Sequence, residues 1–205
     1  MSEARPALYV ATKNRGKLRE FDALLGGRGW NVREYDGYAE VPEGASSYAD
    51  NAARKARALS AQLRAAGMEG IVVADDSGLE VRALGRRPGV LSARYGGPEA
   101  TWPERRRLLL DELAATGSQD RTARFVCALH VVDERGGEHA VVATVDGTIA
   151  EAERGEGGFS YDALFVYPPL GKTFGELTAE EKNAVSHRAR AARAILADLR
   201  RSRPK

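Results

Sequence analysis

The chain has 205 residues, of which 43% are hydrophobic and 29% are charged. This composition is ordinary for a folded globular protein and excludes a disordered, collagen-like or disulfide-rich chain. The 31 basic and 29 acidic side chains nearly balance, so the net charge of +2 does not indicate nucleic-acid binding. No apolar run approaches the roughly 20 residues that cross a bilayer, and no secretory signal opens the chain. We therefore expect no membrane partner, and the single cysteine, Cys127, is consistent with a cytoplasmic protein.

The first part of the chain predicts strands that alternate with helices. Residues 8–11 are apolar and β-prone, and they predict a short buried strand that leads into the polar loop 12–17. Apolar residues at helical spacing over 18–25 predict a helix, which Gly26–Gly27 is expected to end as a C-cap. Residues 30–35 are a second candidate strand.

A long helix and a central strand are predicted next. Residues 46–67 are rich in alanine and predict a helix, with Ser47 or Asp50 as its cap. Residues 71–74 form an apolar run typical of a central strand, which we expect to end at the polar residues 75–78.

The second half predicts further elements of both kinds. In chain order these are a loop over 86–98, a helix over 102–115, strands over 125–132 and 140–145 with a hairpin turn at Gly136–Gly137, a strand extension over 148–153, turns between 155 and 171, and one helix over 179–199. Strands alternating with helices, together with a hairpin, indicate an α/β fold with a mixed sheet. At this length we expect a single domain over residues 1–205, ordered over about 7–200.

Two adjacent carboxylates follow the predicted central strand. Ligand sites in open α/β sheets lie beyond the carboxyl ends of strands, and successive side chains of a strand point to opposite faces. One of Asp75 and Asp76 is therefore expected to face a site and the other to support it. Their oxygens would suit Mg²⁺, although the pair alone leaves a plain turn open as an alternative.

Three other segments carry weaker signals. Asn14 and Gly16 allow a tight turn before a helix that starts near Lys17, where phosphate is favoured, although the P-loop pattern is absent. Residues 157–162 combine two glycines with two aromatic rings and suit a planar heterocycle. Residues 182–188 carry cations suited to phosphate. Read separately, each also fits an ordinary loop, core aromatics or a solvated helix face.

The C-terminal end of the chain is rich in basic residues. A solvated helix face and a frayed tail are the ordinary interpretation, phosphate binding at the start of this stretch is the competing one, and nucleic-acid binding is disfavoured because no reading motif is present. The residues are Arg188, Arg190, Arg193, Arg200, Arg201, Arg203 and Lys205.

Six blocks in a fixed order resemble the inosine triphosphate pyrophosphatase family, the HAM1-like house-cleaning nucleotidases. The resemblance covers residues 8–199, nearly the whole chain, and the ordered set is far more specific than any one block. The blocks are Ala11-Thr12-Lys13-Asn14-Arg15-Gly16-Lys17, Asn51-Ala52-Ala53-Arg54-Lys55-Ala56, Ala74-Asp75-Asp76-Ser77-Gly78-Leu79-Glu80-Val81, Pro88-Gly89-Val90-Leu91-Ser92-Ala93-Arg94-Tyr95, Gly158-Phe159-Ser160-Tyr161-Asp162 and Glu181-Lys182-Asn183-Ala184-Val185-Ser186-His187-Arg188.

The resemblance implies an activity and a fold. Family members hydrolyse nucleoside triphosphates between the α and β phosphates, prefer deaminated purines such as those of ITP, dITP and XTP, need Mg²⁺, and in many cases are homodimers. We therefore expect a purine nucleoside triphosphate substrate, a homodimer and a cytoplasmic location. The implied fold is an elongated, two-lobed domain with a central mixed sheet flanked by helices and the site in the cleft between the lobes.

The resemblance also implies residue roles. Asp76 would be the general base or a metal ligand, with Asp75 beside it, and Glu43 would be a further metal ligand, with Glu40 as second candidate. The residues expected to bind substrate are Thr12, Lys13, Asn14, Arg15, Gly16, Lys17, Asn51 and Lys55 for phosphates, Lys182 for phosphate or the base, Ser77 for the substrate generally, Phe159, Ser160, Tyr161 and Asp162 for the base, and His187 and Arg188 for the purine oxygen at position six.

The base pocket departs from the family pattern Gly-Phe-Gly-Tyr-Asp-Pro. Ser160 replaces the second glycine, which restricts the backbone, and Ala163 replaces the proline. Two functions are therefore kept open: an active pyrophosphatase, and a weakened nucleotide-binding paralogue with altered base preference.

Overall fold

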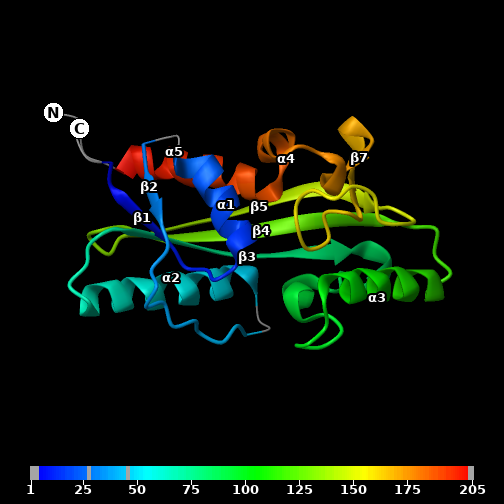
Figure 1. Ribbon diagram of the computed structural model, residues 1–205, viewed down its shortest axis with the longest axis horizontal. Helices are drawn as coiled ribbons and strands as arrows, with labels where there is room; N and C mark the ends of the chain where they lie inside the picture. Colours follow the sequence, from blue (N-terminus) through cyan, green and yellow to red (C-terminus); the bar gives the residue numbers. More distant parts are fainter. Residues whose placement is uncertain (1–4, 27–28, 45–46, 203–205) are drawn as a thin grey trace. The chain divides into compact units, whose positions relative to one another are not determined.

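The computed structural model describes residues 5–26, 29–44 and 47–202 and shows a mixed α/β fold around one seven-stranded sheet (Figure 1). The strand order is β2-β1-β3-β4-β5-β6-β7, with β1 parallel to β2 and β3, and β6 antiparallel to β5 and β7. The strands are β1 (Ala7–Val10), β2 (Asn31–Arg33), β3 (Ile71–Val81), β4 (Thr122–Val132), β5 (Glu138–Ile149), β6 (Phe165–Tyr167) and β7 (Lys172–Thr173). The helices are α1 (Arg15–Leu25), α2 (Tyr48–Ala65), α3 (Trp102–Ala115), α4 (Ala179–Val185) and α5 (His187–Ser202).

The chain forms two compact units. Unit 1 is built from the segments up to Asp76, from Cys127 to Ala143 and from Arg188 onward, and unit 2 from Ser77–Val126 and Thr144–His187. The long strands β3, β4 and β5 contribute residues to both units.

Unit 1 has a core on each face of its part of the sheet. Helices α1 and α5 cover one face, and α2 covers the other (Figure 1). Phe21 of α1 and Ile195 of α5 pack with Val73 of β3, whereas Leu59 of α2 packs with Val72. Because Val72 and Val73 are neighbours in a strand, their side chains point to opposite faces, so this stretch is apolar at every position.

Unit 2 has an aromatic core. Phe125, Phe165 and Phe174 contact one another with ring centroids 4.5–5.8 Å apart. Helix α3 begins with a capping box, in which Thr101 and Glu104 satisfy backbone N–H groups in both directions, and its Leu109 is fully buried in the same core.

The central strand is longer than predicted. Strand β3 does not end at residue 74 but continues through Asp75 and Asp76 to Val81. On the side away from β1 it is hydrogen-bonded to β4, and this pairing overrides the turn propensity of the polar stretch. The last residue of β3 that pairs with β1 is Val73. Asp75 and Asp76 therefore lie within β3, beyond the carboxyl end of β1 rather than beyond the end of their own strand.

The C-terminal helix is interrupted where the sequence predicts one helix. Ser186 adopts extended backbone (φ −64°, ψ 158°) and separates α4 from α5. Serine is a preferred residue immediately before a helix, which explains the break. The prediction of one helix over 179–199 is therefore wrong.

Smaller differences occur at other boundaries. Helix α2 begins after its cap Ser47, as predicted, and Ser46 lies outside the described residues. Gly26 is the C-cap of α1 and has ordinary helical dihedral angles. Gly27, which was also expected at this helix end, lies outside the described residues. Strand β5 ends at Ile149, so the predicted extension to 153 is wrong beyond that residue, and the short strands β6 and β7 lie where only turns, or nothing, were expected.

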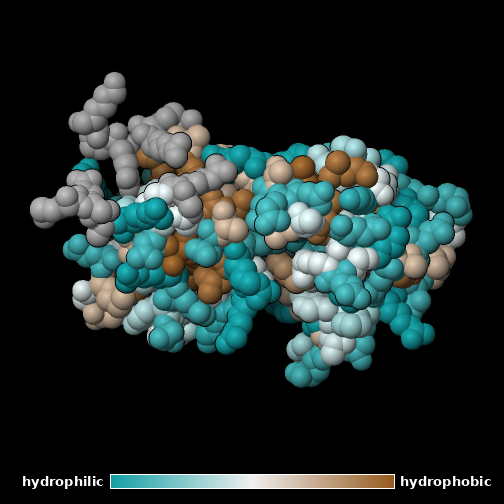
Figure 2. Space-filling view, turned by 45° about the horizontal axis from the view of Figure 1, so that its top comes forward, coloured by the Kyte–Doolittle hydropathy of each residue, from teal (hydrophilic) through white to brown (hydrophobic). Residues whose placement is uncertain are grey.

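The visible surface is mostly polar, with smaller apolar areas (Figure 2). Leu91, Val142 and Leu170 are large apolar side chains that are exposed. Among the helices of the described segments, none combines the length and hydropathy needed to span a bilayer.

Candidate active site

Asp75 and Asp76 point to opposite faces of β3, as the sequence predicts. Asp75 contacts Lys17 of α1 and Arg188 of α5, whereas Asp76 contacts α2. Both carboxylates are buried, at 1% and 4% exposure. Each therefore belongs to a separate cluster of charged side chains in unit 1.

The Asp76 cluster consists of Asp76, Asn51, Lys55 and Glu43. Asn51 Nδ2 donates to Asp76 Oδ2 at 2.9 Å and to the carbonyl of Gly44 at 3.0 Å. Lys55 Nζ lies 2.7 Å from Glu43 Oε1 and 3.6 Å from Asp76 Oδ1. Asn51 and Lys55 are four residues apart on α2 and share a helix face, which explains why both reach Asp76.

Burial and charge act on this cluster in opposite directions. Burial raises the pKa of Asp76, and although Lys55 and the Asn51 hydrogen bond lower it, the pKa stays above its usual value. Burial lowers the pKa of Lys55, but Asp75, Asp76 and Glu43 outweigh burial and raise that pKa. Lys55 is therefore held as a cation between two carboxylates.

The Asp75 cluster is a group of four side chains of alternating charge, which we call the charge ring (Lys17, Glu20, Asp75 and Arg188). Lys17 Nζ lies 3.1 Å from Asp75 Oδ1, Arg188 Nη2 donates to Asp75 Oδ2 at 2.9 Å, and Arg188 Nη1 donates to Glu20. Lys17 and Glu20 are three residues apart on α1 and lie on the same face of that helix. Arg188 is 1% exposed.

The charge ring keeps Asp75 ionised. Burial alone would raise the pKa of Asp75, but Lys17, Arg188 and Lys55 together hold it far below its usual range. Burial alone would lower the pKa of Arg188, but Asp75 and Glu20 raise it. These contacts favour a supporting role for Asp75 and Arg188, and they do not favour direct metal binding by Asp75 or base reading by Arg188.

The loop before α1 carries the predicted phosphate residues. Asn14 is the N-cap of α1, and its Oδ1 accepts from the backbone N–H groups of Gly16 and Lys17 at 2.8 and 3.1 Å. Thr12 Oγ1 accepts from the N–H of Asn14 at 3.1 Å. The N–H groups of Gly16 and Lys17 already bond to Asn14 and are therefore not free to bind phosphate. The side chains of Lys13 and Arg15 are exposed.

The donor set around Asp76 fits a hard divalent cation. Asn51 Oδ1 is buried and accepts no hydrogen bond from any residue that the structure describes. In the described ranges, no three His, Cys, Asp or Glu side chains are placed to hold a metal ion by themselves. Mg²⁺ is typically held by one or two carboxylates together with substrate phosphates and water, so Asp76 and Glu43 would suffice.

In unit 2, the predicted base residues form a tight turn that we call the base turn (Phe159–Asp162). Asp162 Oδ2 accepts from the N–H of Phe159 at 2.7 Å and from Lys182 Nζ at 2.5 Å. Lys182 Nζ lies 4.8 Å from the centroid of the Phe159 ring. Phe159, Asp162 and Lys182 are thus brought together, and Phe159 remains half-buried.

Ser160 occupies a left-handed backbone conformation with φ 62°. This is the position where the family pattern has glycine, a residue that adopts positive φ without strain. Ala163, the other departure, is buried.

Tyr161 and His187 lie in the core of unit 2. Tyr161 is fully buried, its hydroxyl donates to the carbonyl of Ser92 at 3.0 Å, and its ring meets Trp102 edge-on at 5.5 Å. His187 stacks on Phe125 at 4.6 Å. Their placement favours support of the base turn rather than direct contact with a ligand, whereas Ser77 is half-buried in β3.

Comparison with known proteins finds similarity over nearly the whole chain. Residues 8–198 match the Ham1 family. The chain belongs to this family.

Relatives of this Ham1-family protein include enzymes and solved structures. The dITP/XTP pyrophosphatase of Geobacillus kaustophilus is 49% identical over 187 residues, which cover 90% of this chain and 89% of the relative. A HAM1 protein from Coxiella burnetii is 33% identical with a TM-score of 0.84, covering 96% of this chain and all of that one. The Staphylococcus aureus Ham1 protein is similar, at 33% identity and a TM-score of 0.81 over 96% of this chain and all of that one.

Two residues that the sequence analysis did not predict contact the candidate site residues of this Ham1-family protein. Glu20 binds Arg188 across 168 residues of sequence, and Arg106 binds the carbonyl of Ser160 across 54. The spacing of Lys17 and Glu20 on one helix face was a signal for Glu20. Arg106 lies in a run of three arginines, and no local pattern separates it from its neighbours.

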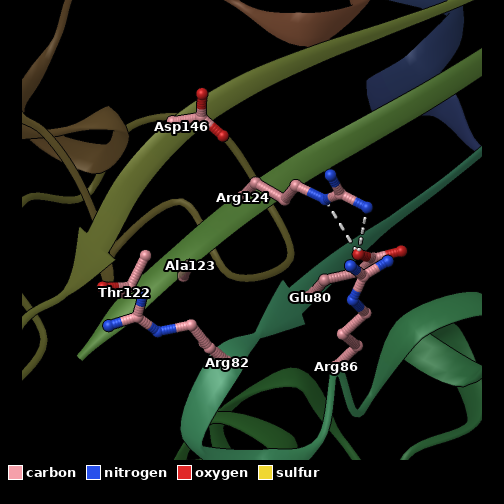
Figure 3. Close-up of a pocket in the computed structure, with 7 residues that line it drawn as sticks. All are labelled: Glu80, Arg82, Arg86, Thr122, Ala123, Arg124 and Asp146. Carbon is pink, nitrogen blue, oxygen red and sulfur yellow. Dashed lines mark hydrogen bonds and ion pairs between the residues drawn. The ribbon is translucent and has the colours of Figure 1, made fainter. Parts of the chain in front are cut away.

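A cavity of about 160 Å³ in unit 2 is separate from the predicted residues (Figure 3). Its lining includes Arg82, Arg86 and Arg124 together with Glu80 and Asp146, and Arg86 and Arg124 lie beside Glu80. Arg124 donates to Glu80, and Arg82 binds Asp120, so most of the cationic charge is already neutralised. We assign no function to this cavity.

Proposed function

We propose that this protein hydrolyses non-standard purine nucleoside triphosphates, namely dITP, ITP and XTP, to the monophosphate and pyrophosphate. The observation that carries the proposal is the buried Asp76 cluster, in which two carboxylates, an amide and a lysine converge beyond the last residue of β3 that pairs with β1. Kinship with a dITP/XTP pyrophosphatase at 49% identity supports the same substrate class. The biological role that follows is the cleansing of nucleotide pools.

The two clusters of unit 1 would act on the triphosphate and the attacking water. Lys55 and Lys17 neutralise phosphate charge, which is the main requirement of phosphoryl transfer. Asp76, oriented by Asn51, positions the water that attacks the α phosphorus and accepts its proton. The charge ring fixes Lys17 through Asp75.

Asp76 and Glu43 are the residues that would hold Mg²⁺, with Glu43 favoured over Glu40 because Glu43 shares Lys55 with Asp76. When bound, the ion supplies charge neutralisation to the phosphate oxygens.

The base turn would select the purine. Phe159 offers a stacking face, and Lys182, held by Asp162, offers a donor to a carbonyl at position six. Adenine carries an amino group there, and a buried donor left unpaired costs about 1–3 kcal/mol. Deaminated purines are therefore preferred over adenine.

The proposal is tested by measuring pyrophosphate separately from phosphate during turnover of ITP, dITP, XTP, GTP and ATP, with and without Mg²⁺. We expect pyrophosphate from the first three only in the presence of Mg²⁺. Asp76→Asn should lower kcat by about 10²–10⁴-fold, the usual contribution of a positioned base.

The matched control is Asp111→Asn, which changes a carboxylate that is 70% exposed and pairs only loosely with Arg107. Its kcat should equal that of the parent. Pyrophosphate release that survives in Asp76→Asn would contradict the role of Asp76. Nucleotide binding without release of pyrophosphate from any substrate would instead favour the weakened paralogue.

Two further properties belong to the same proposal. The family resemblance supports a homodimer, which light scattering of the purified protein would reveal as twice the chain mass. It also supports a cytoplasmic location, which agrees with a single, buried cysteine.

A further inference from the structure

The base turn has a backbone conformation that its own sequence disfavours. Ser160 lies at φ 62°, a backbone conformation that is strained for a residue with a side chain. Within the turn, the N–H of Asp162 donates to the carbonyl of Phe159 over a long distance of 3.2 Å. A strained conformation persists only when surrounding groups hold it. The contacts that hold Ser160 therefore decide where Phe159 lies.

One such contact comes from α3. Arg106 Nη1 donates to the carbonyl oxygen of Ser160 at 2.9 Å, and Arg106 Nε lies 2.9 Å from Glu153 Oε1. The Arg106 side chain is only 15% exposed, so its hydrogen bond is shielded from water. Glu153 places a negative charge beside the guanidinium, and the hydrogen bond from Arg106 holds the peptide after Ser160.

A second contact comes from the same face of α3. Trp102 lies one helical turn before Arg106 and meets the ring of Tyr161 edge-on, with centroids 5.5 Å apart. Tyr161 is itself anchored through its hydroxyl to Ser92. Two successive residues of the base turn, Ser160 and Tyr161, are thus held by two residues of one helix.

We propose that Arg106 is a positioning residue for nucleotide binding, acting through the Ser160 carbonyl to hold Phe159 and Asp162 in the arrangement that receives the base. The inference rests on the proposed function and adds α3, which carries none of the predicted substrate residues, to the determinants of substrate affinity.

The neighbouring arginine provides a matched control. Arg107 follows Arg106 directly, but its side chain is 84% exposed and its only described ion pair is with Asp111 at 3.8 Å. Arg106→Met and Arg107→Met remove the same charge from adjacent positions of the same helix and keep the apolar stem.

The first measurement is steady-state hydrolysis of ITP with pyrophosphate detection. Arg106→Met should raise KM by about 10–100-fold, the range expected for loss of a charge-assisted hydrogen bond, with a much smaller change in kcat. Arg106→Lys retains a cationic donor and should recover part of the loss. Arg107→Met should match the parent. An unchanged KM in Arg106→Met, or an equal rise in Arg107→Met, overturns the inference.

The second measurement does not depend on turnover. Amide hydrogen exchange of the peptide spanning 157–164 should accelerate in Arg106→Met and stay at the parental rate in Arg107→Met. An exchange rate in Arg106→Met equal to that of the parent overturns the inference. A lowered Tm in Arg106→Met, with no faster exchange of this peptide and no higher KM, overturns it as well. If no substrate yields pyrophosphate in the parent, the proposed function fails, while exchange still tests the contact.

A double variant tests the route through Ser160. Glycine adopts φ 62° without strain, so Ser160→Gly combined with Arg106→Met should bind ITP more tightly than Arg106→Met alone. An equal KM in the single and double variants would overturn the route through Ser160.

Discussion

Ser160 and Arg86 are the non-glycine residues with positive φ in the part of the chain that the structure describes, at 62° and 68°. Such a conformation costs an L-residue about 1–2 kcal/mol relative to its ordinary dihedrals. Both lie in unit 2, but only Ser160 lies in the base turn. On the proposed function, strain at this position bears on substrate binding as well as on stability.

Ser160→Gly should raise kcat/KM for ITP, because glycine removes a side chain beside the base and relaxes the turn. It should also raise the free energy of unfolding by about 1 kcal/mol. Pyrophosphate kinetics and urea denaturation measure the two effects. Arg86→Gly relieves comparable strain elsewhere and should change stability without raising kcat/KM. A kcat/KM that is unchanged or lower in Ser160→Gly would show that Ser160 does not crowd the pocket.

Individual residues could be predicted where the information is local. The opposite orientations of Asp75 and Asp76 follow from strand geometry, and the shared helix face of Asn51 and Lys55 follows from helix spacing. The contact of both residues with Asp76 could not be predicted in this way. Arg106 could not be predicted, because its partner depends on tertiary structure.

Helix α2 is joined to the β4–β5 hairpin by a second charged group. Glu138, the first residue of β5, accepts from Arg57 of α2 at 2.7 Å and contacts His130 of β4 at 2.9 Å. The Arg57 hydrogen bond, with smaller help from His130, lowers the pKa of Glu138 to about 2. The ionised carboxylate thus ties three elements together.

Glu138→Gln should alter the acid dependence of stability. The folded-state pKa of Glu138 is depressed from 4.5 to about 2, so its contribution is complete above pH 4.5 and disappears as the pH falls through about 2. The difference in Tm between the parent and Glu138→Gln should therefore shrink over this window. Thermal unfolding at several pH values measures it.

The control for this titration is Glu134→Gln, at an exposed turn position of the same hairpin. Its Tm should follow that of the parent at every pH. A Tm difference between the parent and Glu138→Gln that is constant from pH 7 to pH 2 would count against the assigned titration.

Elements could be predicted better than their ends. The helix over 102–115 was predicted to the residue, because its apolar spacing and its first-turn proline agree. The end of β3 was missed because pairing with β4 is not visible in a polar stretch. The break at Ser186 was missed because helix propensity is high on both sides of it.

At the scale of the whole molecule, the two units are linked through the sheet. The long strands β3, β4 and β5 each pass from one unit into the other. Loss of the pairing of these strands in one unit therefore shortens strands that also belong to the other unit. The α/β class and the mixed sheet could be predicted from the alternation of elements and the hairpin. Two lobes were expected from the family resemblance alone, and the segments that make up each unit could not be predicted, because each unit combines distant parts of the chain.

We therefore predict that the molecule unfolds in one step. Calorimetry should give a single transition, with equal calorimetric and van't Hoff enthalpies, as expected of one cooperative domain. Two resolved transitions would show that the units are independent domains.

The peptide bond between His187 and Arg188 is where the chain leaves unit 2 for unit 1. Six positions along the chain separate Lys182, which binds Asp162, from Arg188, which binds Asp75, and the break at Ser186 lies between them. One residue inserted into α5 between Arg188 and Ile195 would turn these two side chains by about 100° relative to each other around the helix axis, so that Arg188 could not reach Glu20 while Ile195 stays in its core. This segment should consequently accept changes of residue type far more readily than any gain or loss in length.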